Sequence, residues 1–467
     1  MPTTKLNLVP LFIIIFIVSL PSSTNAQVEF PNPGHEGLNT KNIAKINLEQ
    51  KTLNIGLWLQ NRIMYNFSNI PGPGETNIEN TTNYDFFRQR FRSGIDLNIT
   101  DETKPYKVGT YFQLEYRGAW GGSSPIQSDP RDSEPINNPY NRLQSRGLRY
   151  AFVYYNYDDL FNLYAGILPL SDQFDNVLFD SDWDFSVGGI AFSGKFNNQN
   201  YRFAYIRYID GIGYNQDIIN NTNFYLTDYN IVLSKSTNIG FHLYHLDNND
   251  NSSLLSINKN MPKDWSPKNE TWYGINFKTN INRKTVLKGF ILLNKGKNSE
   301  DSHSGFAFKG ESITRIGKTK ISINSIYTSG DKKNEVNRRF VTPSEIFGVS
   351  GFWSYTHLFT ANGPSDVNDI GLEIGNSGAG LFTIQFKLDW PLYKDKLSAQ
   401  IVYAWFKADQ QRNSSKTLGT EASAMLKYSF SQNFNLEFGA AYADLGKFYS
   451  KNNKNLFEVF SRLQFTL

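Results

Sequence analysis

Apolar and polar residues alternate one by one along much of this chain, and residues 52–67 show the pattern most clearly. One face of this run carries Leu53, Ile55, Leu57, Leu59, Ile63, Tyr65 and Phe67. The other face carries Asn54, Gly56, Gln60, Arg62 and Asn66, interrupted by Trp58 and Met64. A period of two is the signature of a β-strand with two different faces. The run is more than twice as long as the roughly 5–6 residues of an ordinary strand, which favours a barrel strand that extends beyond a membrane.

The same alternation recurs from one end of the chain to the other. In residues 84–100 the apolar face holds Phe87, Phe91, Ile95, Leu97 and Ile99, and in residues 106–120 it holds Val108, Phe112, Leu114, Tyr116 and Trp120. Further candidate strands are 145–157, 160–168, 186–196, 201–210, 223–234, 239–246, 271–280, 285–293, 304–311, 319–328, 380–390, 397–408, 418–430, 434–444 and 456–467. The pattern therefore predicts about 18 strands, an even number as in bacterial single-chain barrels.

The connections between these runs alternate in length. Those after even-numbered strands are a few residues long, such as DETKP and RIGK, whereas those after odd-numbered strands are mostly longer. The long ones are 68–83, 121–144, 169–185, 211–222, 247–270 and 329–379. We therefore expect an all-β fold, a transmembrane antiparallel β-barrel with short periplasmic turns and long extracellular loops. A soluble β-sandwich has no reason to alternate its loop lengths in this way.

The N-terminus has the pattern of a secretory signal peptide. Lys5 precedes the apolar stretch Leu11–Leu20, and Thr24 and Ala26 fit a small-x-small cleavage site. We expect a signal peptide over 1–26, a periplasmic segment over 27–51 and the barrel over 52–467; an uncleaved anchor is the alternative. No later window approaches the roughly 20 apolar residues of a spanning helix. These features predict the outer membrane of a Gram-negative bacterium, with membrane lipid and lipopolysaccharide around the barrel.

Three arginines stand two residues apart in the stretch FRQRFR and so share one face of a strand. A lipid-facing Arg or Lys at the membrane midplane costs roughly 2–4 kcal/mol, so these side chains are expected to face the lumen. The same alternation predicts a pore lining made of Arg62, Arg88, Arg90, Arg92, Lys107, Glu115, Arg117 and Arg149. Asp96, Glu115 and Glu421 are candidate partners for this charge. Two interpretations stay open, an anion-selecting wall or a salt-bridged wall that braces the barrel.

The stretch FDSDWDF in the connection 169–185 brings three acidic residues to alternate positions. Asp180, Asp182 and Asp184 have the spacing of some Ca²⁺ loops, but the Gly and closing Glu of an EF-hand are missing. We expect instead a constriction loop that folds over the lumen and faces the arginines. No metal ion or cofactor is predicted.

Enzymatic and nucleic-acid functions have little support in the sequence. The chain has no Cys, which excludes thiol chemistry, and no G-x-S-x-G motif. His242 and His245 are three residues apart on a predicted strand, so they point to opposite faces. His303 and His357 lie in predicted loops. Basic residues are dispersed and the chain is predicted to be exported, so binding of nucleic acid is not expected. The sequence does not indicate the oligomeric state.

Three stretches resemble a known family: GTYFQLEYRGAWGG at 109–122, the FDSDWD loop, and LGTEASAMLKYSFSQNFNLEFGAAYADLGKFY at 418–449. They look like the alginate-export family and related porins of Gram-negative bacteria. The resemblance implies a barrel of about 18 strands whose basic lumen passes an anionic polysaccharide, with Arg88, Arg90, Arg92 and Arg117 as conduction residues.

Two functions follow as hypotheses. The first is an outer-membrane porin or exporter that gives passive passage to polar or anionic solutes, polysaccharide among them. The second is a closed barrel that works as a surface-binding or scaffold protein, with loops 121–144 and 329–379 as its functional part.

Overall fold

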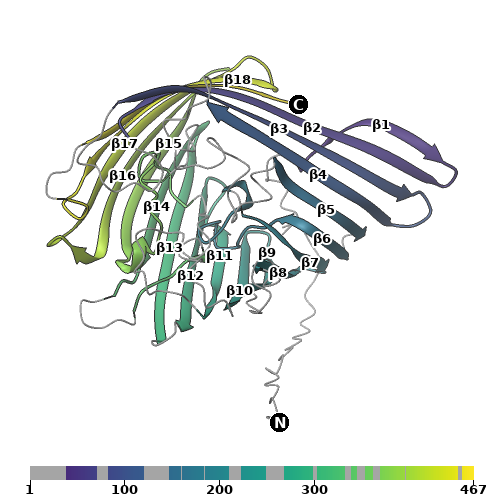
Figure 1. Cartoon of the computed structure of the whole chain (residues 1–467), viewed down its shortest axis with the longest axis horizontal. Coiled ribbons are helices and arrows are strands. Elements are labelled where there is room, and N and C mark those ends of the chain that lie inside the picture. The colour runs from purple at the N-terminus through teal and green to yellow at the C-terminus, as the bar shows by residue number, and fades with distance from the viewer. Residues whose placement is uncertain are drawn as a thin grey trace, which may run out of the picture.

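The fold was obtained as a computed structural model that describes residues 38–70, 83–119, 147–158, 160–183, 185–209, 222–248, 268–297, 302–331, 338–343, 353–360, 369–394, 396–450 and 455–467. One β-sheet of 19 strands contains almost all of its regular structure (Figure 1). The strands are β1 (Lys41–Leu48), β2 (Lys51–Ser68), β3 (Tyr84–Asp101), β4 (Tyr106–Ala119), β5 (Leu148–Tyr157), β6 (Phe161–Pro169), β7 (Ser186–Phe196), β8 (Gln199–Ile209), β9 (Thr222–Ser234), β10 (Thr237–Asn248), β11 (Asn269–Asn280), β12 (Thr285–Lys297), β13 (Ser302–Ile316), β14 (Thr319–Thr328), β15 (Leu381–Tyr393), β16 (Leu397–Arg412), β17 (Ser415–Ser429), β18 (Phe434–Leu445) and β19 (Leu456–Thr466).

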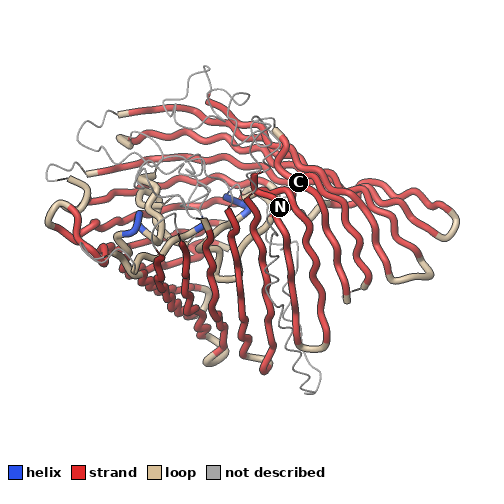
Figure 2. The backbone as a smooth tube through the Cα atoms, turned by 60° about the horizontal axis from the view of Figure 1, so that its bottom comes forward, coloured by secondary structure: helices blue, strands red, loops and turns tan. Residues whose placement is uncertain are grey.

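Eighteen of these strands, β2 to β19, close into a barrel (19 in the sheet less β1). Each pairs antiparallel with the next along the chain, and β19 returns to pair with β2 from Glu458↔Ser68 to Thr466↔Gln60. Figure 2 shows the strands running side by side around the wall. Closure leaves no free sheet edge within the wall, as a membrane-spanning sheet requires. The predicted antiparallel barrel of about 18 strands is confirmed.

Strand β1 was not predicted from the sequence, because it lies in the segment 27–51 that was expected to be periplasmic. All eight of its residues are exposed, so neither face carries the one-sided apolar pattern that marks a wall strand. It pairs with the first part of β2, from Leu48↔Lys51 to Lys41↔Leu57. The chain end meets β2 just beyond this, where the Leu467 N–H donates to the Leu59 carbonyl (2.8 Å). Strand β1 therefore continues the edge of β2 where β19 ends.

The two faces of the wall differ as the alternation predicts. On β3, Phe87 and Phe91 are 43 % and 39 % exposed on the outer face, whereas Arg90 on the inner face is 6 % exposed. Large apolar side chains continue this outer surface on other strands, among them Phe241, Ile291 and Phe386. In the part of the chain that the structure describes, no helix has the length and apolar character needed to cross a membrane.

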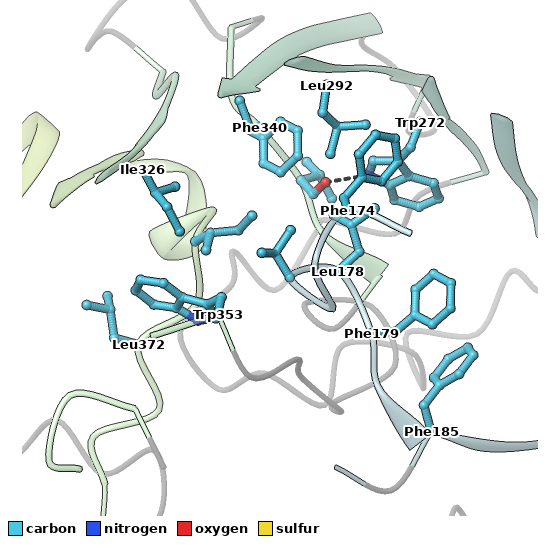
Figure 3. Packing of buried hydrophobic residues seen from close by; sticks show 14 of the residues in the cluster. Phe174, Leu178, Phe179, Phe185, Trp272, Leu292, Ile326, Phe340, Trp353 and Leu372 are labelled. Atoms are coloured by element: carbon cyan, nitrogen blue, oxygen red, sulfur yellow. Dashed lines mark hydrogen bonds between the residues drawn. The ribbon is translucent and has the colours of Figure 1, made fainter. Parts of the chain in front are cut away.

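The inside of the barrel holds an apolar core formed by segments that leave the wall and fold inward. Figure 3 shows Phe174 of the connection between β6 and β7 beside Trp272 of β11, with Phe179 and Phe185 further along the same connection. Further segments, 338–343, 353–360 and 369–380, add Phe340, Val341, Trp353, Phe359 and Ile374 to the same cluster. The Trp272 indole N–H donates to the Val341 carbonyl at 2.6 Å (Figure 3). The long connections that were predicted to be extracellular thus partly fill the interior; loop 121–144 lies outside the described residues.

Candidate functional site

Five arginines form a cross on the inner face of β2, β3 and β4. Arg88, Arg90 and Arg92 follow one another along β3, and all three are buried. The strand register sets Arg90 directly opposite Arg62 of β2 on one side and Arg117 of β4 on the other. Like charges directly opposite each other destabilise a sheet. The arrangement therefore opposes folding unless other groups compensate the charge.

Glu115 of β4 supplies a carboxylate that compensates part of the arginine charge. Its carboxylate accepts a charge-assisted hydrogen bond from Arg92 and another from Arg149 of β5 at 2.8 Å. Arg117 is a third cation within 3.5 Å of the same carboxylate. One carboxylate cannot neutralise three guanidinium groups, so the cluster formed by Arg92, Glu115, Arg117 and Arg149 carries a positive excess.

Neutral amides bind two further arginines of the cross. The Arg90 Nη2 donates to Gln60 Oε1 at 2.8 Å, and the Arg62 Nε donates to Gln464 Oε1 at 2.9 Å. An amide satisfies a guanidinium N–H without cancelling its charge. These two contacts therefore orient the arginines without cancelling their charge.

Lys107 lies further along β4, away from the arginine cross. Its Nζ is 3.4 Å from Asp96 Oδ2 and 5.1 Å from the centre of the Tyr154 ring. Asp96 also accepts a hydrogen bond from the Tyr154 hydroxyl at 2.7 Å. Of the three acidic partners that the sequence suggested, Asp96 thus meets Lys107, and Glu115 meets the arginines.

The third suggested partner, Glu421 of β17, has a different role, which corrects that expectation. Its two carboxylate oxygens accept the backbone N–H groups of His357, Leu358 and Phe359. Glu421 therefore holds the segment 353–360 against the wall. Sequence alternation placed Glu421 correctly on an inner face but could not reveal that a folded-in backbone would reach it.

The Asp-rich connection between β6 and β7 meets the arginine wall at Arg149. Arg149 Nη2 donates to the carbonyls of Ser181 (2.8 Å) and Asp182 (3.2 Å), and it lies 3.7 Å from Asp182 Oδ1. Asp180 bonds inside the loop, where it accepts from the Ser171 hydroxyl at 2.8 Å. Asp184 lies outside the described residues.

Asp172, which the sequence did not single out, anchors this loop. Its carboxylate accepts the backbone N–H groups of Phe174 (2.6 Å), Leu178 (2.7 Å) and Phe179 (2.9 Å). Burial raises its pKa to about 7 and outweighs these three hydrogen bonds, which act in the opposite direction. Asp172 therefore titrates near neutral pH, inside a tightly folded loop.

A second group of charges was also missed, and it fixes the tip of the same loop to the opposite part of the wall. The Asp175 carboxylate contacts Lys288 of β12 at 2.7 Å and also Lys309 of β13. Glu311 lies 3.0 Å from Lys288 and accepts a hydrogen bond from the Tyr355 hydroxyl. The alternate positions of Lys309 and Glu311 were a usable signal, because they place both side chains on one face of β13.

The lysines hold the pKa of Asp175 below its usual range. Burial alone would raise this pKa, but the charges of Lys309 and Lys288 outweigh it. The tip of the loop is therefore bound by an ionised carboxylate at all ordinary pH values.

A polar cavity of about 810 Å³ lies beside this loop. Its lining includes Lys235 and Ser236 in the short turn between β9 and β10, so it reaches the short-turn end of the barrel. Asp175 and Lys288 line it towards the loop. Asparagines from neighbouring strands complete much of the lining, namely Asn200, Asn230, Asn238, Asn276 and Asn280. The cavity is suited to polar solutes and water.

The histidines lie apart from one another. His242 faces inward and bonds Asp228, whereas His245 contacts Thr271 on the other face of β10, as the spacing predicted. His303, predicted in a loop, is the second residue of β13 and bonds Glu270. In the described ranges, no three His, Cys, Asp or Glu side chains are grouped so that they could hold a metal ion.

Solved structures with the same fold are outer-membrane porins. Pseudomonas aeruginosa OccK3 (OpdO) superposes with a TM-score of 0.52 at 12 % identity, covering 88 % of this chain and 95 % of that one. Acinetobacter baumannii OccAB4 gives a TM-score of 0.54 at 11 % identity, covering 88 % and 97 %. Pseudomonas aeruginosa OpdL gives 0.54 at 11 %, covering 88 % and 98 %. No protein-family model matches the chain, and no curated protein is detectably similar to it in sequence.

These similarities define the class of fold, that of Gram-negative outer-membrane porins, and at this level of identity they show the fold alone. The narrower resemblance to the alginate-export family, suggested by residues 109–122 and 418–449, is not shown by them.

Proposed function

We propose that this protein is an outer-membrane porin through which anionic and polar solutes pass passively. The observation that carries the proposal is the cross of five arginines, Arg62, Arg88, Arg90, Arg92 and Arg117, on the inner wall of β2–β4. A porin fold supplies the route and the arginines supply the selectivity. In this proposal Lys107, Glu115 and Arg149 also line the pore, and Asp180, Asp182 and Asp184 belong to the constriction loop.

The arginine cross is better explained by conduction than by bracing. A wall built only for stability would place opposite charges across the register, because such pairs stabilise a sheet whereas like pairs destabilise it. Here Arg62, Arg90 and Arg117 follow one another across three strands. Rings or walls of Arg in a narrow pore attract anions. The amide bonds of Arg62 and Arg90 do not cancel charge. Because Arg88, Arg90 and Arg92 are buried, the column on β3 would act on a passing anion through its electric field.

The orientation in the membrane follows from the loop lengths. The short turns would face the periplasm and the long connections the exterior, as in bacterial barrels. The outer apolar face would contact lipid, and lipopolysaccharide would surround the external rim. A signal peptide over 1–26 and a periplasmic segment over 27–51, which includes β1, complete this proposal. An anionic polysaccharide is the particular solute that the alginate-export resemblance adds.

The experiment is to measure ion selectivity after the charge on β3 has been removed. The variant Arg88→Ser/Arg90→Ser/Arg92→Ser is reconstituted in planar bilayers and compared with the unmodified protein. We expect the preference for chloride over potassium to fall. The matched control, Arg283→Ser/Arg315→Ser/Lys318→Ser, removes the same charge from exposed positions in two short turns and at the end of β13 and should keep the preference. An unchanged preference in the β3 variant would contradict the proposal.

A second candidate function, a closed barrel that binds partners through its external loops, is favoured by one observation. The apolar cluster around Phe174, Trp272, Phe340 and Trp353 fills part of the interior. If inward-folded segments close the whole lumen, the reconstituted protein will carry no current. Stable single-channel steps would exclude this function, and their absence in correctly folded protein would favour it over the porin.

A further inference from the structure

A second feature of the inner wall lies on β9, β10 and β11, away from the arginine cross of β2–β4. The register places Gly240 of β10 directly between Asn230 of β9 and Asn276 of β11. All three residues are on the inner face, and His242 follows two positions later on the same face of β10. The row Asn–Gly–Asn leaves a gap over Gly240, where a side chain is missing between two amides.

His242 is held with one ring nitrogen directed to this gap. Its Nδ1 is 2.7 Å from Asp228 Oδ1, and Asp228 also accepts from Arg202 Nε at 2.6 Å and from the Tyr244 hydroxyl at 2.8 Å. A carboxylate that accepts so many donors is ionised. Nδ1 of His242 therefore carries a proton that points to Asp228, and in the neutral ring Nε2 presents a lone pair.

Three acceptor atoms converge over Gly240. A Cβ built at this glycine would come within 2.5 Å of Asn230 Oδ1, Asn276 Oδ1 and His242 Nε2 together. Asn276 is fixed in this orientation because its Nδ2 donates to the Gln173 carbonyl. His242 is only 4 % exposed, and its Nε2 has no hydrogen-bond partner among the described residues.

Such an arrangement is costly without a positive or donating group at its centre. Two amide oxygens and a lone pair repel one another at short range, and a buried unsatisfied acceptor costs about 1–3 kcal/mol. A neutral imidazole whose other nitrogen donates to a carboxylate is the usual form of a metal-binding histidine. Imidazole selects zinc, nickel, cobalt or copper ions over calcium and magnesium.

We propose that His242 Nε2, Asn230 Oδ1 and Asn276 Oδ1 bind one divalent transition-metal ion of the zinc and nickel type. Asp228 acts behind His242 as the group that fixes its tautomer. Asn230 and Asn276 line the cavity of about 810 Å³ at the short-turn end, so the ion enters from that side and takes its remaining ligands from water. The Phe174 ring meets His242 edge-on at 5.0 Å, which closes the side towards the loop. This site does not depend on whether the barrel conducts.

The test is calorimetric titration of the full-length protein in detergent, without a polyhistidine tag, with ZnCl₂ and separately with NiCl₂ and CaCl₂. We expect one zinc or nickel ion per chain and no calcium binding. The variant His242→Asn keeps a donor for Asp228 but lacks Nε2, and its affinity should fall at least tenfold, the lower end of the effect of losing a supporting group at a metal site. His245→Asn is the matched control on the opposite face and should bind as the unmodified protein does.

A second variant keeps the test decisive if His242→Asn does not fold. Gly240→Ala places a methyl group among the three acceptors, which are ends of side chains that can shift. Its zinc affinity should also fall at least tenfold, whereas Gly310→Ala, which meets no atom within 4 Å, should bind normally. Absence of zinc and nickel binding up to about 1 mM, where affinity corresponds to only about 4 kcal/mol, would overturn the site. Equal binding by the two Gly variants, or by the two His variants, would also overturn it.

Discussion

Glu115 shows how much the inner wall depends on one residue. It is shared by Arg92, Arg117 and Arg149, so Glu115→Gln would leave three buried cations without their carboxylate. Removing one partner of a buried ion pair costs about 3–5 kcal/mol, and we expect a loss of about 3 kcal/mol because the Glu115 side chain is still 11 % exposed. Urea unfolding in detergent measures this loss of unfolding free energy. Glu102→Gln, in an exposed turn, is the control, and equal stabilities of the two variants would contradict this role.

Asp172 gives a pH dependence whose sign can be stated. Its folded pKa is raised, by burial, from 3.8 to about 7, so the folded loop retains a proton that an unfolded Asp would release. The loop is therefore most stable below about pH 4, weakens as the pH rises, and reaches its full penalty above pH 7. Hydrogen exchange of the amides of Leu178 and Phe179 should speed up between pH 5 and 8 beyond the intrinsic rate. Asp172→Asn should remove this additional acceleration of exchange. An acceleration that persists in the variant would contradict the role of Asp172 in the pH dependence.

Sequence alternation could predict the direction of these side chains but not most of their partners. Arg88, Arg90 and Arg92 had one favourable side because lipid excludes charge. Which acid they meet depends on the cross-strand register and on where long loops fold, and neither has a local signal. Glu115 was found because it lies on the neighbouring strand. Asp172 and Asp175 were missed because only the folded loop brings them to backbone N–H groups and to lysines of β12 and β13.

The connection between β6 and β7 folds into the interior, and we predict that it controls how open the interior is. Its tip is bound through Asp175 to Lys288 and Lys309. Asp175→Asn would leave Glu311 as the carboxylate shared by Lys288 and Lys309 and would remove the ion pairs of the loop tip. The tip should therefore detach, and the single-channel conductance should increase or fluctuate. Asp158→Asn is a matched control in an exposed turn whose positive φ of 50° suits Asn. Unchanged current in Asp175→Asn would show that the tip does not restrict the pore.

The pH behaviour of this contact differs from that of Asp172. Because the lysines depress the Asp175 pKa, the contact contributes stability at every pH above the ordinary Asp value near 3.8 and is lost only as the pH falls through the depressed value. Loss of this contact should therefore cause no step in the conductance of the unmodified protein between pH 7 and about 4. The test is to look for a step that is present in the unmodified protein and absent in Asp175→Asn. Such a step would contradict the assignment.

Strand β1 is the element that the sequence did not reveal, and it can be removed in a test. Barrel closure relies on pairing of β19 with residues 60–68 of β2, whereas β1 pairs with residues 51–57. Deleting residues 38–48 should therefore leave barrel assembly intact and lower stability by about 1 kcal/mol or less, since all residues of β1 are exposed. Heat-modifiable gel mobility measures assembly. Failure to assemble would show that β1 is part of the closure.

At the scale of the whole molecule, two simple patterns were enough to predict the architecture. Period-two alternation predicted all 18 wall strands, because each strand of a barrel has one apolar and one polar face. Alternating loop lengths predicted their antiparallel order, because short turns and long loops lie at opposite ends of the barrel. The interior filling was not predictable. Segments 338–343 and 353–360 have no regular period, and their apolar residues bury against Trp272 and Phe406 only after the barrel exists. Long-range packing of this kind leaves no repeat in the sequence.

The central claim is that the lumen conducts and that its wall favours anions. The most direct measurement is the reversal potential of the unmodified protein in a planar bilayer with a KCl gradient. We predict stable single-channel currents and a reversal potential with the sign of chloride selectivity, which decreases at high salt as screening shortens the range of the arginine charges. A reversal potential with the sign of potassium selectivity, or folded protein that carries no current, would contradict the account.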